Sequence, residues 1–162
     1  MRPLAFLFAF LLLATSADAN PPPVNGVLWL GDLQLRFDAN RWDVNGAKSE
    51  YDIYCKSRDC VGVSIAVTIR STADTCTAEA LRFDGAEVPG PGRVDRFNHA
   101  GLSFLVAEGN SDCANLVGGP LRACTTYAGK VYLFDAPGQR CRTNPHVSDD
   151  FNAILQGLKP RR

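Results

Sequence analysis

The segment between residues 54 and 60 concentrates the side chains best suited to bind a partner. It reads Tyr54-Cys55-Lys56-Ser57-Arg58-Asp59-Cys60 and lies between two predicted strands. Strands joined by four residues bring their ends together, so a Cys55–Cys60 disulfide would close a small polar loop and present its charges outward. Pre-ordering a loop removes part of the entropy cost of binding. The segment therefore predicts either a structural staple or a partner-binding loop, whose binding residues are Lys56, Ser57, Arg58 and Asp59.

The other polar residues do not form a complete catalytic motif. The two histidines, His99 and His146, both fall in predicted turns, whereas a histidine base needs a positioned acid and nucleophile. The segment 101–105 lacks the last glycine of a Gly-x-Ser-x-Gly nucleophile elbow. The glycine-rich segments 89–92 and 118–120 lack the lysine and the following helix of a phosphate-binding loop.

Two pairs of neighbouring carboxylates resemble, in residue type, the acids of a glycosidase. Asp149 and Asp150 are explained by the start of a helix, and Glu50 and Asp52 by a solvated strand end. The sequence therefore predicts a protein that is not an enzyme, with no catalytic residues and no cofactor. An unrecognised periplasmic hydrolase remains open as an alternative.

The six cysteines form an even set, which favours three disulfides in an oxidising compartment. Their spacing gives neither a Cys-x-x-Cys redox pair nor the clustered ligands of a zinc site, so no metal is expected. Only the 55–60 pair has a direct argument. We prefer 113–124 as the second pair and, by elimination, 76–141 as the third, so the disulfide residues are Cys55, Cys60, Cys76, Cys113, Cys124 and Cys141.

The N-terminus predicts export. Arg2 is followed by an unbroken apolar run over residues 4–13, and Ala17-Asp18-Ala19 matches the small-x-small pattern of a signal peptidase site. We expect residues 1–19 to be a cleavable signal peptide, 20–26 an extended proline-rich leader and 27–160 a single domain. The mature protein is then soluble and secreted or periplasmic, without a membrane anchor, since no other apolar run approaches membrane-spanning length.

The charge balance narrows the class of partner. The chain has 17 basic and 17 acidic residues, and removal of residues 1–19 takes away one of each. A neutral protein is a poor match for nucleic acid or for an anionic membrane as its main partner. A protein partner is therefore expected, and the sequence leaves the oligomeric state open.

Apolar and polar residues alternate in several segments, as in half-buried strands. Residues 61–69 give the clearest such strand, and residues 27–37 include a two-residue turn at Gly31-Asp32. The turn at Ala128-Gly129 places Cys124 opposite Leu133. The predicted strands cover residues 27–37, 51–55, 61–69, 94–97, 102–107, 121–127 and 130–134.

The remaining segments are predicted as loops and helices. Residues 39–47 read as a loop carrying Trp42, and residues 75–83 as a short helix. The final helix is capped by Ser148, has an apolar face at residues 151, 154, 155 and 158, and is stopped by Pro160. Loops are predicted at 88–92, 109–120 and 139–147.

These elements predict an α+β domain: a largely antiparallel β-sheet with a short mid-chain helix and a C-terminal amphipathic helix packed on it, stapled by disulfides. The order of elements resembles the PsbP-like fold, named for the extrinsic proteins of photosystem II. That resemblance covers most of the mature chain and rests on element order alone. It implies a non-enzymatic accessory protein.

A second, local resemblance concerns the 55–60 loop. The inhibitor of vertebrate lysozyme (Ivy) family has a disulfide-closed protruding loop of pattern Cys-Lys-Pro-His-Asp-Cys that enters the lysozyme cleft. This chain is similar at Cys55, Lys56, Asp59 and Cys60, and in the following Ile65-Ala66-Val67. It departs at Ser57 and Arg58, where the family has proline and the histidine tied to inhibition. The resemblance implies an inhibitor that meets the catalytic acids of a lysozyme-type hydrolase.

Taken together, the sequence predicts an exported binding module for a protein partner. Inhibition of a lysozyme-type hydrolase through the 55–60 loop is its specific form. The alternative is an accessory or assembly protein of the bacterial envelope with a PsbP-like fold.

Overall fold

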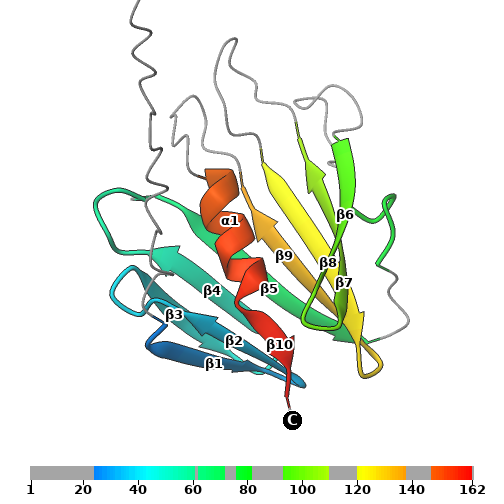
Figure 1. The fold of residues 1–162 in the computed structure, drawn as a ribbon, viewed down its shortest axis with the longest axis horizontal. Coiled ribbons are helices and arrows are strands. Elements are labelled where there is room, and N and C mark those ends of the chain that lie inside the picture. The colour runs from blue at the N-terminus through cyan, green and yellow to red at the C-terminus, as the bar shows by residue number, and fades with distance from the viewer. Residues whose placement is uncertain are drawn as a thin grey trace, which may run out of the picture.

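The computed structural model describes residues 24–60, 62–71, 76–81, 93–109, 120–137 and 147–161. The expected signal peptide, most of the leader, the 88–92 loop, Cys113, Cys141 and His146 lie outside these residues. The described chain forms a three-stranded and a seven-stranded antiparallel sheet, and one α-helix lies beside the small sheet on the same face of the large sheet (Figure 1). The α+β class predicted from the sequence is therefore confirmed.

The small sheet has the strand order β1-β2-β10, formed by β1 (Gly26–Leu30), β2 (Leu33–Phe37) and β10 (Leu158–Pro160). The predicted turn at Gly31-Asp32 joins β1 to β2, and Gly31 has φ 59° while Asp32 is not in the left-handed region. Glycine at the first central position is typical of the tight hairpin turn that keeps strand twist.

Strand β10 was missed because it has only three residues and contains Pro160. The helix α1 (Val147–Gln156) begins one residue before Ser148, so Ser148 does not cap it, and it ends before Gly157 rather than at Pro160. Gly157 lies directly against β2: its carbonyl accepts a hydrogen bond from the Arg36 amide at 2.9 Å. A Cβ there would collide with the Arg36 carbonyl oxygen, so this close approach requires glycine.

The large sheet has the strand order β3-β4-β5-β9-β8-β7-β6. Its first strand, β3 (Trp42–Ala47), corrects the prediction of a loop at 39–47. Asp43, Asn45 and Gly46 disfavour a strand locally. Pairing with β4 (Glu50–Cys55) nevertheless holds them in register, with Trp42 opposite Cys55.

The other strands of the large sheet confirm the predicted pairings. The hairpin of β8 (Leu121–Tyr127) and β9 (Lys130–Ala136) turns at Ala128-Gly129 and places Cys124 opposite Leu133, as expected. The remaining strands are β5 (Ser64–Ser71), β6 (Arg93–His99) and β7 (Leu102–Glu108).

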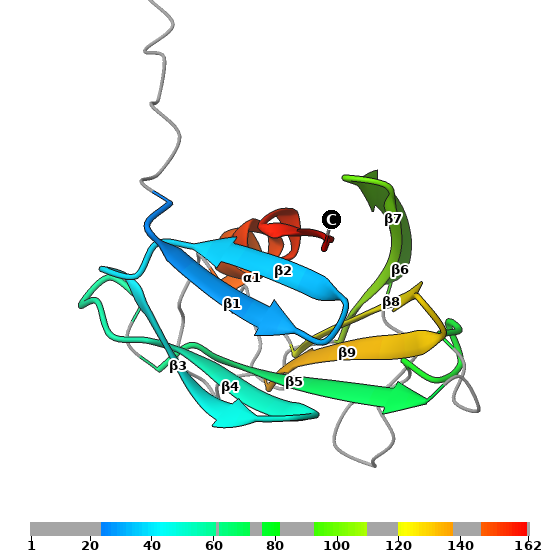
Figure 2. The ribbon, with the colours of Figure 1, turned by 90° about the horizontal axis from the view of Figure 1, so that it is seen from below.

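The main core lies between the two sheets, with α1 inserted beside the small sheet (Figure 2). Alternation along each strand sends one set of side chains into this core. Of the predicted apolar face, Phe151, Ile154 and Leu155 lie on α1 and Leu158 lies on β10, and each is at most 2% exposed. The largest fully buried side chains in the described core are Tyr132, Phe104, Phe134 and Phe151.

A smaller cluster lies on the opposite face of the large sheet, formed by Leu81, Ala107, Cys124 and Val131. The segment 76–81 covers this face and is tied to it by a disulfide between Cys76 and Cys124. The described residues of the predicted 75–83 helix form a turn, closed by a hydrogen bond from the Leu81 amide to the Thr77 carbonyl, and not a regular helix. The disulfide and the burial of Leu81, rather than helix propensity, set this conformation.

The Cys76–Cys124 bridge also corrects the predicted pairing. Cys124 is not joined to Cys113, nor Cys76 to Cys141. The reason is topological: Cys124 lies on the outer sheet face, and the chain that crosses that face is the segment after β5. The predicted Cys55–Cys60 disulfide is present.

Candidate functional site

The Cys55–Cys60 loop, residues 55–60, follows the end of β4 at the corner between β4 and β5. Its main chain is held by hydrogen bonds at both ends. The Cys55 amide donates to the Val63 carbonyl at 2.9 Å, and the Val63 amide to the Cys60 carbonyl at 3.0 Å. Within the loop, the Cys60 amide donates to the Ser57 carbonyl at 3.4 Å. The loop is therefore a closed, ordered turn.

The disulfide of this loop is part of the main core and not a surface clasp. Cys60 is fully buried, Cys55 is 9% exposed, and both pack among the core residues with Trp42 and Val63. Burial of the bridge anchors the base of the loop to the sheets. Between the two cysteines, Lys56, Arg58 and Asp59 are exposed.

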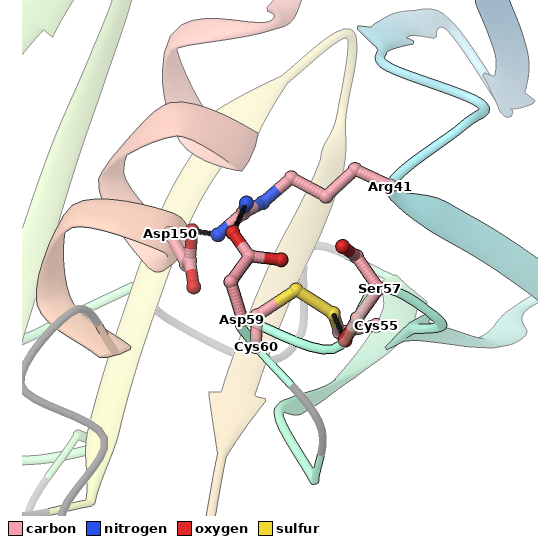
Figure 3. A network of polar contacts seen from close by, with 6 residues as sticks. All are labelled: Arg41, Cys55, Ser57, Asp59, Cys60 and Asp150. Carbon is pink, nitrogen blue, oxygen red and sulfur yellow. Dashed lines mark hydrogen bonds and ion pairs between the residues drawn. A yellow bond between two sulfur atoms is a disulfide. The ribbon is translucent and has the colours of Figure 1, made fainter.

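Arg41 joins the loop to the helix (Figure 3). Its guanidinium donates through one nitrogen to the Asp59 carboxylate and through the other to Asp150 Oδ1, at 2.6 Å. Its carbonyl also accepts a hydrogen bond from the Lys56 amide at 3.0 Å. One residue at the start of β3 thus fixes the loop by both its side chain and its main chain.

Asp150 makes this contact from inside the protein. It lies in the first turn of α1, where a carboxylate also complements the helix dipole, and its side chain is only 8% exposed. Its other oxygen, Oδ2, is buried without a hydrogen-bond partner in the described structure. Because a buried carboxylate needs compensation, Arg41 is the group that makes the charge of Asp150 tolerable there.

The contacts between Arg41 and Asp59 favour the charged forms of both side chains. A hydrogen bond with Ser57, and after it the Arg41 guanidinium, lowers the pKa of Asp59 below the ordinary value. Partial burial alone would lower the pKa of Arg41, but its hydrogen bonds with Asp150 and Asp59 outweigh this and leave the pKa raised. Both partners therefore stay ionised through the neutral range.

The four predicted binding residues divide into two kinds. Asp59 is exposed but engaged inward by Arg41, and Ser57 is half-buried and bonded to Asp59. Lys56 and Arg58 are exposed, and neither forms an ion pair within the described residues. The loop therefore presents two cations on a frame that Ser57 and Asp59 help to hold. Asp59 makes this internal contact although its side chain is 55% exposed.

The two network residues outside the loop, Arg41 and Asp150, were not predicted as site residues. Arg41 falls in a segment without a periodic pattern, and Asp150 already had a sufficient explanation at the helix start. Arg41 lies 18 positions before Asp59 and 109 positions before Asp150, so no local sequence pattern connects them. The single local feature that could have drawn attention to Arg41 is its position next to Trp42.

The carboxylate pair Glu50 and Asp52 lies on the exposed side of β4, at an open cavity of about 400 Å³. Its described lining includes neither histidine nor cysteine. Within the described residues, no three metal-binding side chains converge. Among the residues that the structure describes, no helix is long and apolar enough to cross a membrane.

Comparison with known proteins adds a likeness of fold only. No family model matches the chain, and no match was found among curated protein sequences. A solved structure that matches is that of cyanobacterial PsbP (CyanoP) from Synechocystis sp. PCC 6803. Its TM-score is 0.49 at 16% sequence identity, and the match covers 80% of this chain and 87% of that chain. The chain thus has a weak similarity to the PsbP-like fold, which says nothing about what it binds.

Proposed function

We propose that this protein is an exported, non-enzymatic binding module that contacts an acidic site of a protein partner through the Cys55–Cys60 loop. The observation that carries the proposal is that some residues of the loop hold its conformation while others are exposed to solvent. Asp59 and the disulfide hold the loop, while Lys56 and Arg58 are exposed and form no ion pair with any residue that the structure describes. A loop fixed before binding loses little conformational entropy when it docks.

Arg58 is the expected anchor of the contact. A guanidinium can donate two parallel hydrogen bonds to one carboxylate, which gives geometry as well as attraction. Lys56 adds a second cation of less fixed direction. The chemistry that best fits this pair is a site with two carboxylates, such as the cleft of a glycoside-cleaving enzyme.

Muramidase inhibition is the specific form of the proposal. It rests on the resemblance of Cys55, Lys56, Asp59 and Cys60 to the loop of the inhibitor of vertebrate lysozyme family. Arg58 stands where that family has histidine, and an arginine side chain does not lose its charge in the range where histidine titrates. Inhibition is therefore expected to persist above pH 7, where a histidine contact weakens.

The test is an inhibition assay of the mature protein against several lysozyme types at micromolar concentration, between pH 6 and pH 8. We expect inhibition of at least one type with no loss across this range. A panel in which no enzyme is inhibited would leave the loop as a structural staple.

Export is tested separately by N-terminal sequencing of the protein recovered outside the cytoplasm. The small-x-small site at residues 17–19 predicts that the mature chain begins at Asn20. An intact Met1 in the exported fraction would overturn the signal peptide.

A further inference from the structure

Exposed large apolar side chains gather on β1 and just before it. Val24, Val27 and Trp29 are 47%, 51% and 48% exposed. They are three of the five large apolar residues that are exposed in the described structure. Val27 and Trp29 lie two residues apart on β1, so their side chains point to the same, outer face of the small sheet. Isolated apolar residues on a surface are ordinary, but adjacent exposed ones, as on β1, offer apolar contact area to a partner.

Basic side chains surround this row. Arg36 lies directly opposite Val27 on β2, and the Arg161 guanidinium lies over the Trp29 ring, 4.8 Å from its centroid. Lys159 lies on β10, opposite Gln34. The three cations form no ion pair within the described residues. Among the described residues, the outer face of β1, β2 and β10, together with the adjoining Arg161, thus combines two apolar side chains with three cations and has no carboxylate.

The main chain of β1 is also available. In the described structure β1 pairs only with β2, so its other edge has no strand beside it. Leu30 and Leu33 flank the two-residue turn and share the hydrogen bonds nearest to it. Because hydrogen-bonded pairs alternate along an antiparallel ladder, Leu28 also bonds to β2, and the amides and carbonyls of Val27 and Trp29 face the open edge.

We propose that β1 is a docking strand that accepts an extended, acidic segment of another polypeptide as an added strand. Strand addition would pair the main-chain groups of Val27 and Trp29, and carboxylates of the segment would meet Arg36 and Arg161. A second copy of this chain fits less well, because the same face of that copy would bring three more cations and no acid. This surface does not use the Cys55–Cys60 loop, so the proposal goes beyond the function proposed above.

The chain contains a reporter for the test. Trp42 is 4% exposed whereas Trp29 is 48% exposed, so a Trp42→Phe variant leaves one fluorophore at the proposed site. The probe is a seven-residue peptide of alternating glutamate and valine, capped at both ends. We expect a saturable blue shift of Trp29 emission. A matched peptide with lysine in place of glutamate should give none.

Two further experiments distinguish binding by strand addition from binding by charge attraction alone. Arg161→Gln should weaken binding about tenfold, through loss of a charge-assisted contact, while Arg96→Gln on β6 should leave it unchanged. N-methylation of all glutamate amides, or of all valine amides, blocks one edge of the peptide. One of these two peptides must lose binding.

Equal binding of both methylated peptides, or an emission shift with anionic phosphatidylglycerol vesicles but not with the glutamate peptide, would overturn the proposal. Equal binding by the Arg161→Gln and Arg96→Gln proteins would do the same. Each variant is compared by circular dichroism, so that a failure to fold is not read as a failure to bind.

Discussion

The two disulfides of the described structure connect the chain at very different range. Cys55 and Cys60 are 5 residues apart and close one turn at the end of β4. Cys76 and Cys124 are 48 residues apart and tie the segment after β5 to the outer face of the large sheet. A long closed loop restricts the unfolded chain far more than a short one. The long bridge is therefore expected to serve global stability, and the short bridge chiefly the shape of its loop.

Loss of the long bridge should have the largest effect on stability. We expect the double variant Cys76→Ala/Cys124→Ala to lower the free energy of unfolding by about 4 kcal/mol, from the loop-entropy relation alone. Urea denaturation measured against the parent protein gives the value. A loss as small as that for the short bridge would contradict the assignment of global stability to Cys76–Cys124.

Removal of the Arg41 side chain should come next. Arg41→Met leaves Asp150 buried without its cation, and we expect a loss of about 3 kcal/mol, at the low end for a broken buried pair because Arg41 keeps some hydration. Adding Asp150→Asn to this variant should restore part of the loss. If the two effects are simply additive, Arg41 and Asp150 are not energetically coupled.

The short bridge should contribute less. Cys55→Ala/Cys60→Ala should lower the free energy of unfolding by about 2 kcal/mol, because the closed ring is small. Hydrogen exchange of the amides at positions 60 and 63 should accelerate well beyond that of β8 and β9. Uniform acceleration across the protein would show that the bridge acts globally and would remove the contrast between the two disulfides.

The smallest effect is expected at Asp59. Because its pKa is lowered in the folded protein, its contribution to stability is complete above the unfolded pKa and is lost as the pH falls through the folded pKa. The carboxyl resonance of Asp59 should therefore titrate with a midpoint below 3.8, the ordinary value. In the Arg41→Met protein the midpoint should rise. A midpoint at or above 3.8 in the parent protein would exclude the charged contact.

The difference in sequence separation between the two disulfides also explains which features could be predicted from the sequence. The Cys55–Cys60 pair, the hairpin at Ala128-Gly129 and the apolar face of α1 depend on residues close in the chain, and the structure confirms all three. Pairing of Cys76 with Cys124 depends on which segment crosses the outer face of the large sheet, and no local pattern records that. Strand β3 was missed for a related reason, since its partner β4 compensates for weak strand formers.

The candidate site divides in the same way. The loop and its charged residues were visible in the sequence, but the function of Asp59 was not. Its partner Arg41 lies 18 residues away and joins it to Asp150 in the helix. This long-range contact distinguishes the residue that holds the loop, Asp59, from the exposed cations Lys56 and Arg58.

The most direct test of the proposed function is the effect of Arg58→Ala on partner inhibition. Arg58 is exposed, so the unfolding midpoint should remain that of the parent protein. Loss of a central anchor should weaken inhibition of the responsive lysozyme by roughly 2–4 kcal/mol, a factor of about 30 to 1,000. Arg96→Ala, which removes the same charge from an exposed position on β6, should inhibit like the parent. Equal inhibition by the Arg58→Ala and parent proteins would contradict the account and leave the loop with a structural role only.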